Sequence, residues 1–158
     1  MVSRRRNTPE QQAAEAAWAA MSPELRAAYE RMHRRELAYR EELFKLYPSY
    51  LVNEIPDAYG NRVPTTFIRC WLRHRHCFAY VHDGRYRFPT FQFANGVPKA
   101  AIARVIALLY PMDGWVVMFW FAAANGWLDE GVSPLSVLDT DPEAVLVAAS
   151  HANDLISD

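Results

Sequence analysis

The sequence predicts a mostly α-helical protein, in which a helix-turn-helix-like segment with a small β-hairpin is followed by a compact C-terminal helical bundle. Two helix-start signals near the N-terminus, Thr8-Pro9 and Ser22-Pro23, are each followed by a helical stretch. The dipeptide Asp83-Gly84 separates two short strand-like runs, which predicts a hairpin. With 158 residues, of which 51% are apolar, the chain is long enough to close a core.

The sequence divides into three predicted parts. Residues 1–47 hold the N-terminal helices and a candidate dimerisation element, residues 48–88 hold the helix-turn-helix-like segment with its hairpin, and residues 89–158 form a helical domain.

The first two helices carry the candidate dimerisation element. Thr8 is expected to cap a helix to about Ala20, with Gln11 closing a capping box. A second helix is expected to run to about Tyr47, where Pro48 stops it. One stripe of this second helix follows heptad spacing: Leu25, Tyr29, Met32, Glu36, Tyr39, Leu43 and Leu46. Such a stripe packs either on a second copy of the chain or on the rest of the same chain, and the sequence leaves both open.

The middle of the chain combines turns, a short helix and the hairpin. Residues 48–64 contain three prolines and a Gly-Asn pair, so they hold at most one short helix. The next segment places Phe67, Ile68, Trp71 and Leu72 on one helical face and its arginines elsewhere. In the hairpin, alternate residues of the second strand are expected to point outward as a charged wing.

This arginine-rich segment is a candidate DNA-binding surface. A short helix with apolar anchoring on one side and arginines on the other suits a major groove, where guanidinium groups bind guanine or phosphate and hydroxyls bind phosphate. The alternative is a charged surface that covers the core without binding DNA. The candidate DNA contacts are Thr65, Thr66, Arg69, Arg73, Arg75, Arg85 and Arg87.

The same stretch contains a set of potential metal ligands, Cys70, His74, His76 and Cys77. Zinc requires four ligands that converge tetrahedrally, and adjacent residues such as His76 and Cys77 tend to diverge. The sequence therefore favours a buried cysteine and exposed histidines, and predicts no metal site and no cofactor.

Charge is distributed unevenly along the chain. Residues 1–87 contain 15 Lys and Arg against 10 Asp and Glu, and residues 88–158 contain 2 against 8, giving net charges of +5 and -6. A basic half suits a polyanion and an acidic half suits a basic protein surface, although the two halves can also neutralise each other.

The C-terminal part is expected to form four short helices. The first buries Ile102, Val105, Ile106 and Leu109, and the second, 115–124, is apolar all round and ends in a left-handed cap at Asn125-Gly126. Ser133-Pro134 starts a third helix. Asp141-Pro142 starts the last one, which is expected to reach Asp158 with an inner stripe of Val145, Leu146, Ala149, Ala152 and Ile156.

An ordered series of motifs in this part resembles a known family. Phe88-Pro89-Thr90-Phe91-Gln92-Phe93, Asp113-Gly114-Trp115, Trp120-Phe121, Asn125-Gly126-Trp127-Leu128 and Ser133-Pro134-Leu135-Ser136-Val137-Leu138 follow one another in the chain. Together they resemble the toxin-binding domain at the C-terminus of Xre/MbcA/ParS-type antitoxins. The resemblance covers about the last 70 residues well and the preceding segment weakly.

The resemblance implies an antitoxin of a type II toxin-antitoxin pair. It implies that the C-terminal domain grips a cognate toxin, commonly a RES-domain enzyme that consumes NAD, and that the protein regulates its own operon by binding operator DNA as a dimer or higher oligomer. The residues that it implies for toxin binding are Trp120, Asn125, Trp127, Leu128, Asp139, Asp141, Glu143, Asp154 and Asp158.

Other functional classes fit the sequence less well. No Gly-rich phosphate loop, His-Glu-x-x-His motif or Gly-x-Ser-x-Gly elbow is present, so a non-enzymatic protein is expected. The longest apolar stretch is roughly half of the approximately 20 residues that span a bilayer. Only two cysteines are present, which favours a soluble cytoplasmic protein. The alternatives are a DNA-binding transcriptional regulator without a toxin partner and a small zinc enzyme.

Overall fold

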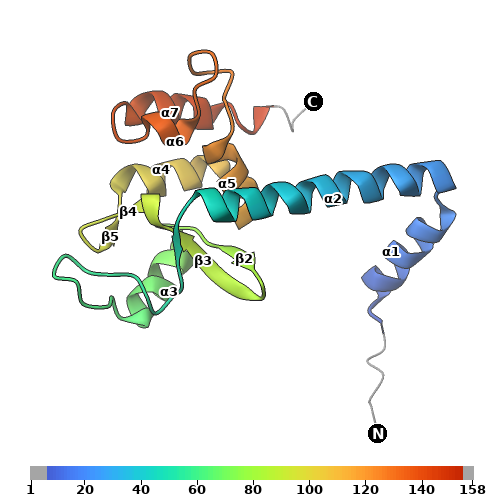
Figure 1. Ribbon diagram of the computed structural model, residues 1–158, viewed down its shortest axis with the longest axis horizontal. Helices are drawn as coiled ribbons and strands as arrows, with labels where there is room; N and C mark the ends of the chain where they lie inside the picture. The colour runs from blue at the N-terminus through green and yellow to red at the C-terminus, as the bar shows by residue number, and fades with distance from the viewer. Residues whose placement is uncertain (1–6, 155–158) are drawn as a thin grey trace, which may run out of the picture. The chain divides into compact units, whose positions relative to one another are not determined.

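The computed structural model describes residues 7–154 of the chain and confirms a mostly helical fold with small antiparallel sheets. The chain forms two compact units, Met1–Glu42 and Leu43–Asp158. The three-part division of the sequence stays a prediction. The N-terminal unit contains α1 (Pro9–Ala20) and most of α2 (Pro23–Leu46), which ends in the second unit (Figure 1).

The N-terminal helices begin as predicted. Thr8 Oγ1 accepts a hydrogen bond from the Gln11 amide at 3.2 Å, and Gln11 Oε1 accepts one from the Thr8 amide at 2.8 Å, so the capping box is confirmed. Ser22 Oγ accepts from the Leu25 amide at 3.2 Å at the start of α2. Neither helix buries a side chain among residues 7–42.

The heptad stripe on α2 lies mostly in solvent. Leu25, Tyr29 and Met32 are 47%, 50% and 66% exposed, and Tyr39 and Leu46 are exposed as well. Only Leu43, which belongs to the second unit, is buried in the core. Of the other stripe residues, Tyr29 meets Trp18 of α1 edge-on, with ring centroids 6.5 Å apart.

The second unit contains a three-stranded antiparallel sheet in the order β1-β3-β2. The strands are β1 (Ser49–Tyr50), β2 (Tyr80–His82) and β3 (Arg85–Pro89). Asp83 and Gly84 have φ values of 50° and 73°, as a tight hairpin turn requires, so the predicted hairpin is confirmed. After the 3-10 turn Thr90–Gln92, the strands β4 (Phe93–Ala94) and β5 (Val97–Pro98) form a second, two-stranded sheet.

Residues 51–64, which directly precede helix α3 (Thr65–Arg73), form turns and an isolated bridge between Pro56 and Arg62 and contain no helix. The second helix of the predicted helix-turn-helix-like segment is thus present and the first is replaced by turns. Ile68 anchors α3 in a small core that also contains Ile55, Val63, Cys77 and Phe88. Phe67, which was expected on the buried face, is instead 57% exposed.

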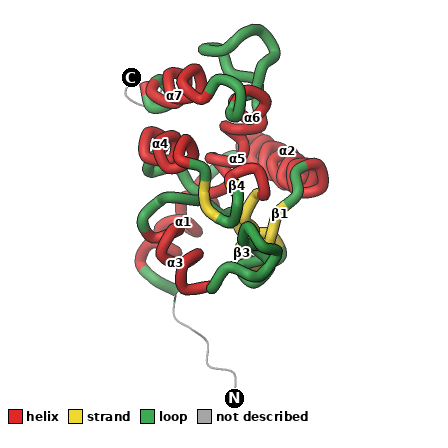
Figure 2. Tube along the Cα trace, turned by 90° about the vertical axis from the view of Figure 1, so that its left-hand side faces the viewer, coloured by secondary structure: helices red, strands yellow, loops and turns green. Residues whose placement is uncertain are grey.

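The C-terminal helices pack together as predicted. They are α4 (Ala100–Leu109), α5 (Gly114–Ala122), α6 (Pro134–Val137) and α7 (Pro142–Ser150). Helix α7 lies on α4 and α6, α6 also contacts α5, and both views place α7 and α6 on the side of α4 and α5 away from α3 (Figures 1 and 2). The four apolar residues predicted for the buried face of α4 are all buried, and so are Val145, Leu146 and Ala149 of α7.

Two helix ends differ from the predictions. Helix α5 ends at Ala122, and its C-cap Ala123 has an extended backbone with φ -81° and ψ 149°, so the expected left-handed cap at Asn125-Gly126 is wrong. Helix α7 ends at Ser150 rather than continuing to Asp158, whereas Ile156 and Asp158 lie outside the described residues.

Helix α5 packs against strand β2. Trp115 Nε1 donates to the Val81 carbonyl at 2.8 Å, and the Trp115 ring stacks on Tyr80 with centroids 4.0 Å apart. Burial of Tyr80 raises the pKa of its phenol, while a hydrogen bond with Ser49 and the charge of Arg87 oppose that rise.

Within residues 7–154, no single helix is long and apolar enough to cross a bilayer, and only α4 and α5 taken together, bent by 113°, satisfy the length and composition of a span.

Candidate partner-binding surfaces

The loop between α5 and α6 has a defined conformation because its ends and its centre are hydrogen-bonded. The Asn125 amide donates to the Val132 carbonyl at 3.0 Å, and the Leu128 amide donates to the Asn125 carbonyl at 3.0 Å. The side chain of Asn125 accepts from the Trp127 amide at 3.0 Å. Asn125, a predicted toxin contact, therefore shapes the loop that presents Trp127.

Trp127 is the most exposed of the tryptophans, at 60%. Its ring stacks in parallel on His151, with centroids 3.6 Å apart and an interplanar angle of 9°. His151 Nδ1 in turn lies 2.8 Å from Asp154 Oδ2. One face of the indole is thus held by α7 and its C-terminal turn, and the remaining surface faces solvent.

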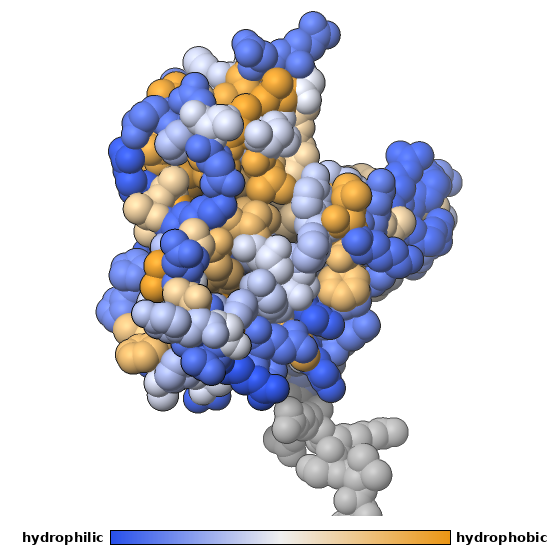
Figure 3. All heavy atoms as spheres, turned by 60° about the vertical axis from the view of Figure 1, so that its left-hand side comes forward, coloured by the Kyte–Doolittle hydropathy of each residue, from blue (hydrophilic) through white to orange (hydrophobic). Residues whose placement is uncertain are grey.

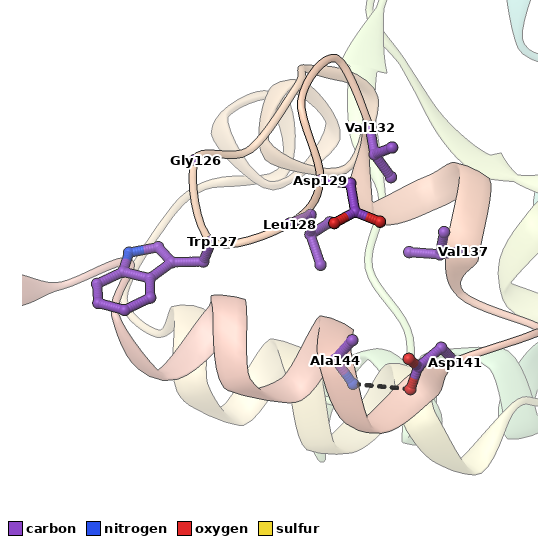
Figure 4. A pocket seen from close by; sticks show the side chains of 8 residues that line it. All are labelled: Gly126, Trp127, Leu128, Asp129, Val132, Val137, Asp141 and Ala144. Carbon is purple, nitrogen blue, oxygen red and sulfur yellow. Dashed lines mark hydrogen bonds between the residues drawn. The ribbon is translucent and has the colours of Figure 1, made fainter.

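A pocket of about 400 Å³ lies beside Trp127, between this loop, α6 and the start of α7 (Figure 4). Leu128, Val132, Val137 and Ala144 supply apolar lining, and Asp129 and Asp141 supply carboxylates. In Figure 4 the indole of Trp127 points away from the pocket, whereas Leu128 and Asp129 point toward it. The pocket therefore offers apolar walls and negative charge together.

Most of the predicted acidic contacts already have partners within the chain. Asp139 pairs with Lys99 at 2.7 Å and Glu143 pairs with Arg104 at 3.1 Å. Asp141 caps α7 by accepting from the Ala144 amide at 3.1 Å, and Asp154 contacts His151. The two ion pairs link the start of α4 to the end of α6, and α4 to α7, and they partly neutralise this acidic charge at the surface of the bundle.

Two acidic residues that the sequence reasoning did not single out remain without an ion pair in the described part of the chain. Asp129 and Glu130 are exposed at the tip of the loop, directly after Trp127 and Leu128. Their position next to a predicted aromatic contact is the sequence signal that identifies them.

Trp120 occupies a different environment from Trp127. It is half-buried on α5 and meets Phe121 edge-on, with centroids 5.2 Å apart, against the main core. Leu128 is also half-buried and lines the pocket. Of the predicted aromatic contacts, Trp127 is the one whose ring is mainly in solvent.

Among the described residues, some of the predicted DNA contacts are exposed without an ion pair, and others pack on aromatic rings of the same chain. Thr66, Arg69 and Arg73 are exposed on one face of α3, and Arg69 and Arg73 form no ion pair with residues 7–154. Arg85 is exposed at the start of β3, also without an ion pair in that range. Thr65 is half-buried at the first position of α3.

Arg75 and Arg87 have aromatic partners instead. The Arg75 guanidinium lies 3.6 Å from the Tyr110 ring centroid, and that of Arg87 lies 5.1 Å from the Phe44 centroid. Arg87 is half-buried because it pairs with Tyr80 across the hairpin and shares the strand face that meets the core. The expected outward alternation of Arg85 and Arg87 is therefore wrong for Arg87, and the outward face of the hairpin carries Val81 and Tyr86.

An apolar groove of about 450 Å³ on the second unit was not predicted from the sequence. Tyr59, Phe67, Trp71 and Val97 line it, together with Pro64. Figure 3 shows one face of the molecule, on which apolar patches reach the surface between polar ones (Figure 3). The sequence does offer one indication of this groove. Phe67 lies 100° around the helix from the buried Ile68, so its side chain can point to solvent while that of Ile68 points to the core.

The Cys and His residues around α3 do not form a metal site. Among residues 7–154, no three His, Cys, Asp or Glu side chains are placed to share an ion. Cys70 is exposed while Cys77 is buried, and burial raises the pKa of the Cys77 thiol to about 12. A thiol that stays protonated is a poor metal ligand, so this geometry does not support the zinc hypothesis.

Comparison of the chain with protein-family models, with curated proteins and with solved structures found no match.

Proposed function

We propose that this protein is the antitoxin of a type II toxin-antitoxin pair and acts in the cytoplasm without catalysing a reaction. It binds a cognate toxin through the surface around Trp127 and regulates its operon by binding DNA through α3 and the hairpin. The proposal rests on the motif series in residues 88–138 and on the exposure of Trp127. A tryptophan that is 60% exposed on a hydrogen-bonded loop is costly to keep in water and is a typical interface anchor.

The pocket beside Trp127 suits a basic side chain of the toxin. The aliphatic stem of an Arg or Lys would lie against Leu128 and Val132, and its charged end would meet Asp129 and Asp141. This chemistry agrees with a toxin whose nucleotide-binding cleft is basic, such as a RES-domain enzyme that consumes NAD. Glu130 adds negative charge at the rim.

The proposed DNA surface is smaller than the sequence suggested. Thr66, Arg69 and Arg73 form its centre and Arg85 extends it, while Arg75 and Arg87 are held by aromatic rings. The three guanidinium groups of Arg69, Arg73 and Arg85 give each chain a weak, salt-dependent affinity for DNA phosphates. Two chains that bind neighbouring half-sites together reach a higher affinity.

The decisive experiment is neutralisation of the product of the adjacent gene, measured as restored growth on co-expression and as the Kd of the purified pair. Trp127→Ala should weaken binding by about 2 kcal/mol or more, which is roughly thirtyfold in Kd. Asp129→Lys should weaken it as well, by repelling the basic side chain. Tyr59→Ala, an aromatic that is 91% exposed outside this surface, is the matched control and should bind as the wild type does. Wild-type binding by Trp127→Ala would refute the proposed surface.

A stand-alone DNA-binding regulator is the second candidate. The ion pairs Lys99–Asp139 and Arg104–Glu143 favour this candidate, because they connect helices of the C-terminal bundle to one another and so give these acidic residues a structural role. In that case the double variant Arg69→Ala/Arg73→Ala should lose operator affinity and lower its salt dependence, while no growth-arresting partner is bound.

A further inference from the structure

We propose that the N-terminal unit is a self-association module, in which α1 of one chain packs against the α2 stripe of a second copy and the reverse contact forms by symmetry. This inference is independent of the proposed antitoxin function. It starts from the absence of any buried side chain among residues 7–42. Helices of this length gain most of their stability from packing of an apolar face, and the packing within residues 7–42 leaves every side chain at least partly exposed.

One helix exposes a stripe of large apolar side chains and the other exposes a stripe of small ones, so the two surfaces are complementary in shape. On α2, Leu25, Tyr29 and Met32 form a stripe of large side chains that are 47–66% exposed. On α1, a stripe of exposed alanines faces one direction: Ala13, Ala16, Ala17 and Ala20. Large side chains of one helix fit against a face of small residues on another, which allows a close helix-helix approach. Within one chain, Trp18 of α1 and Tyr29 of α2 meet edge-on, with ring centroids 6.5 Å apart.

The charges of the two helices are also complementary. Helix α1 carries two acidic residues and no Lys or Arg, and one of the two, Glu10, lies beside the alanine stripe, whereas the 26–35 stretch of α2 carries four arginines against Glu30. Arg26 and Arg35 flank the stripe, and the buried Nε of Arg26 has no hydrogen-bond acceptor among the described residues. A second copy supplies an acidic helix to each basic stretch, and because the match is reciprocal it closes as a twofold dimer.

The test is the mass of the full-length protein in solution, measured by sedimentation equilibrium over a micromolar concentration series. The wild type should be a dimer, and Met32→Glu should raise the dimer dissociation constant at least tenfold, because it places a charge in the stripe. Met32 is 66% exposed, so this change leaves the folded chain intact, which circular dichroism at high concentration verifies. Leu37→Glu is the matched control, since Leu37 is exposed on another face of the same helix, and it should remain dimeric.

Charge reversal tests which helices meet. Arg26→Glu/Arg35→Glu should weaken the dimer at low salt, and adding Glu10→Arg, at the acidic position beside the alanine stripe, should restore part of the lost affinity. A monomeric wild type, or equal loss of the dimer in Met32→Glu and Leu37→Glu, would overturn the proposal. Failure of the combined reversal to restore affinity would overturn the pairing of α1 with α2 of the second copy.

Discussion

Gln92 illustrates how one side chain of the motif series serves the fold rather than a partner. It is 0% exposed, its Oε1 accepts from the Phe78 amide at 2.9 Å, and its Nε2 donates to the Phe78 carbonyl at 2.8 Å. The Gln92 side-chain amide thereby satisfies both backbone groups of Phe78, which lies two residues before the start of β2. Removal of this side chain would leave two buried backbone groups without partners, which is costly.

Replacement of Gln92 by Met should therefore lower the free energy of unfolding by about 3 kcal/mol, since methionine fills similar space but pairs with neither backbone group. Chemical denaturation of the purified protein measures the change. Gln12→Met, at an exposed position of α1, is the control and should stay within about 0.5 kcal/mol of the wild type. Equal stabilities of the two variants would show that the bonds to Phe78 contribute little.

Arginine residues of this chain differ in exposure according to the element that carries them. Arg69 and Arg73 are exposed on α3, whereas Arg87, with the same side chain, is half-buried beside the Phe44 ring. Strand alternation correctly places Arg85 and Arg87 on the same face of β3. It does not tell which face meets the core, because that depends on the elements packed against the hairpin.

At the scale of elements, the contact between α5 and β2 determines how closely the helical bundle approaches the sheet. Gly114 stands at the first position of α5, where a Cβ would lie 1.9 Å from the Ala79 carbonyl oxygen and 2.7 Å from its carbon. The obstructing atoms belong to backbone and cannot rotate away. The absence of a side chain at Gly114 is what lets Trp115 reach the Val81 carbonyl.

The substitution Gly114→Ala should consequently destabilise the protein by at least about 3 kcal/mol, because α5 must move away from the sheet. Gly126→Ala offers a matched comparison, since no atom lies within 4 Å of its added Cβ and its φ is not in the left-handed region. That variant should unfold within about 1 kcal/mol of the wild type or be slightly more stable. Thermal unfolding followed by near-ultraviolet circular dichroism distinguishes the two, and a small effect at Gly114 would contradict the close approach.

At the scale of the whole molecule, the two units differ in how they are stabilised. Both hydrophobic clusters are built from residues numbered 43 and above, and the described part of the N-terminal unit adds no buried residue to them. Unit 43–158 therefore contains its own core, whereas the described part of the N-terminal unit leaves its large apolar side chains exposed.

A variant that begins at Glu36 should therefore retain a cooperative unfolding transition and its near-ultraviolet circular dichroism. The last turns of α2, with Leu43 and Phe44, remain present to complete the core. The same variant should sediment as a monomer, since it lacks both stripes of the proposed dimer. A shortened protein without fixed aromatic signals would show that residues 7–35 contribute to the core after all.

The sequence by itself determined the helix starts, the hairpin and the buried faces of the bundle. These depend on local chemistry: caps such as Thr8 and Asp141, turn residues such as Asp83-Gly84, and apolar spacing along single helices. Only the tertiary structure decided that Gln92 is buried, that Arg87 is engaged with Phe44, and that Trp127 is presented in solvent while Trp120 is not. Those outcomes depend on which residues distant in the chain come together, and residue type and spacing do not specify that.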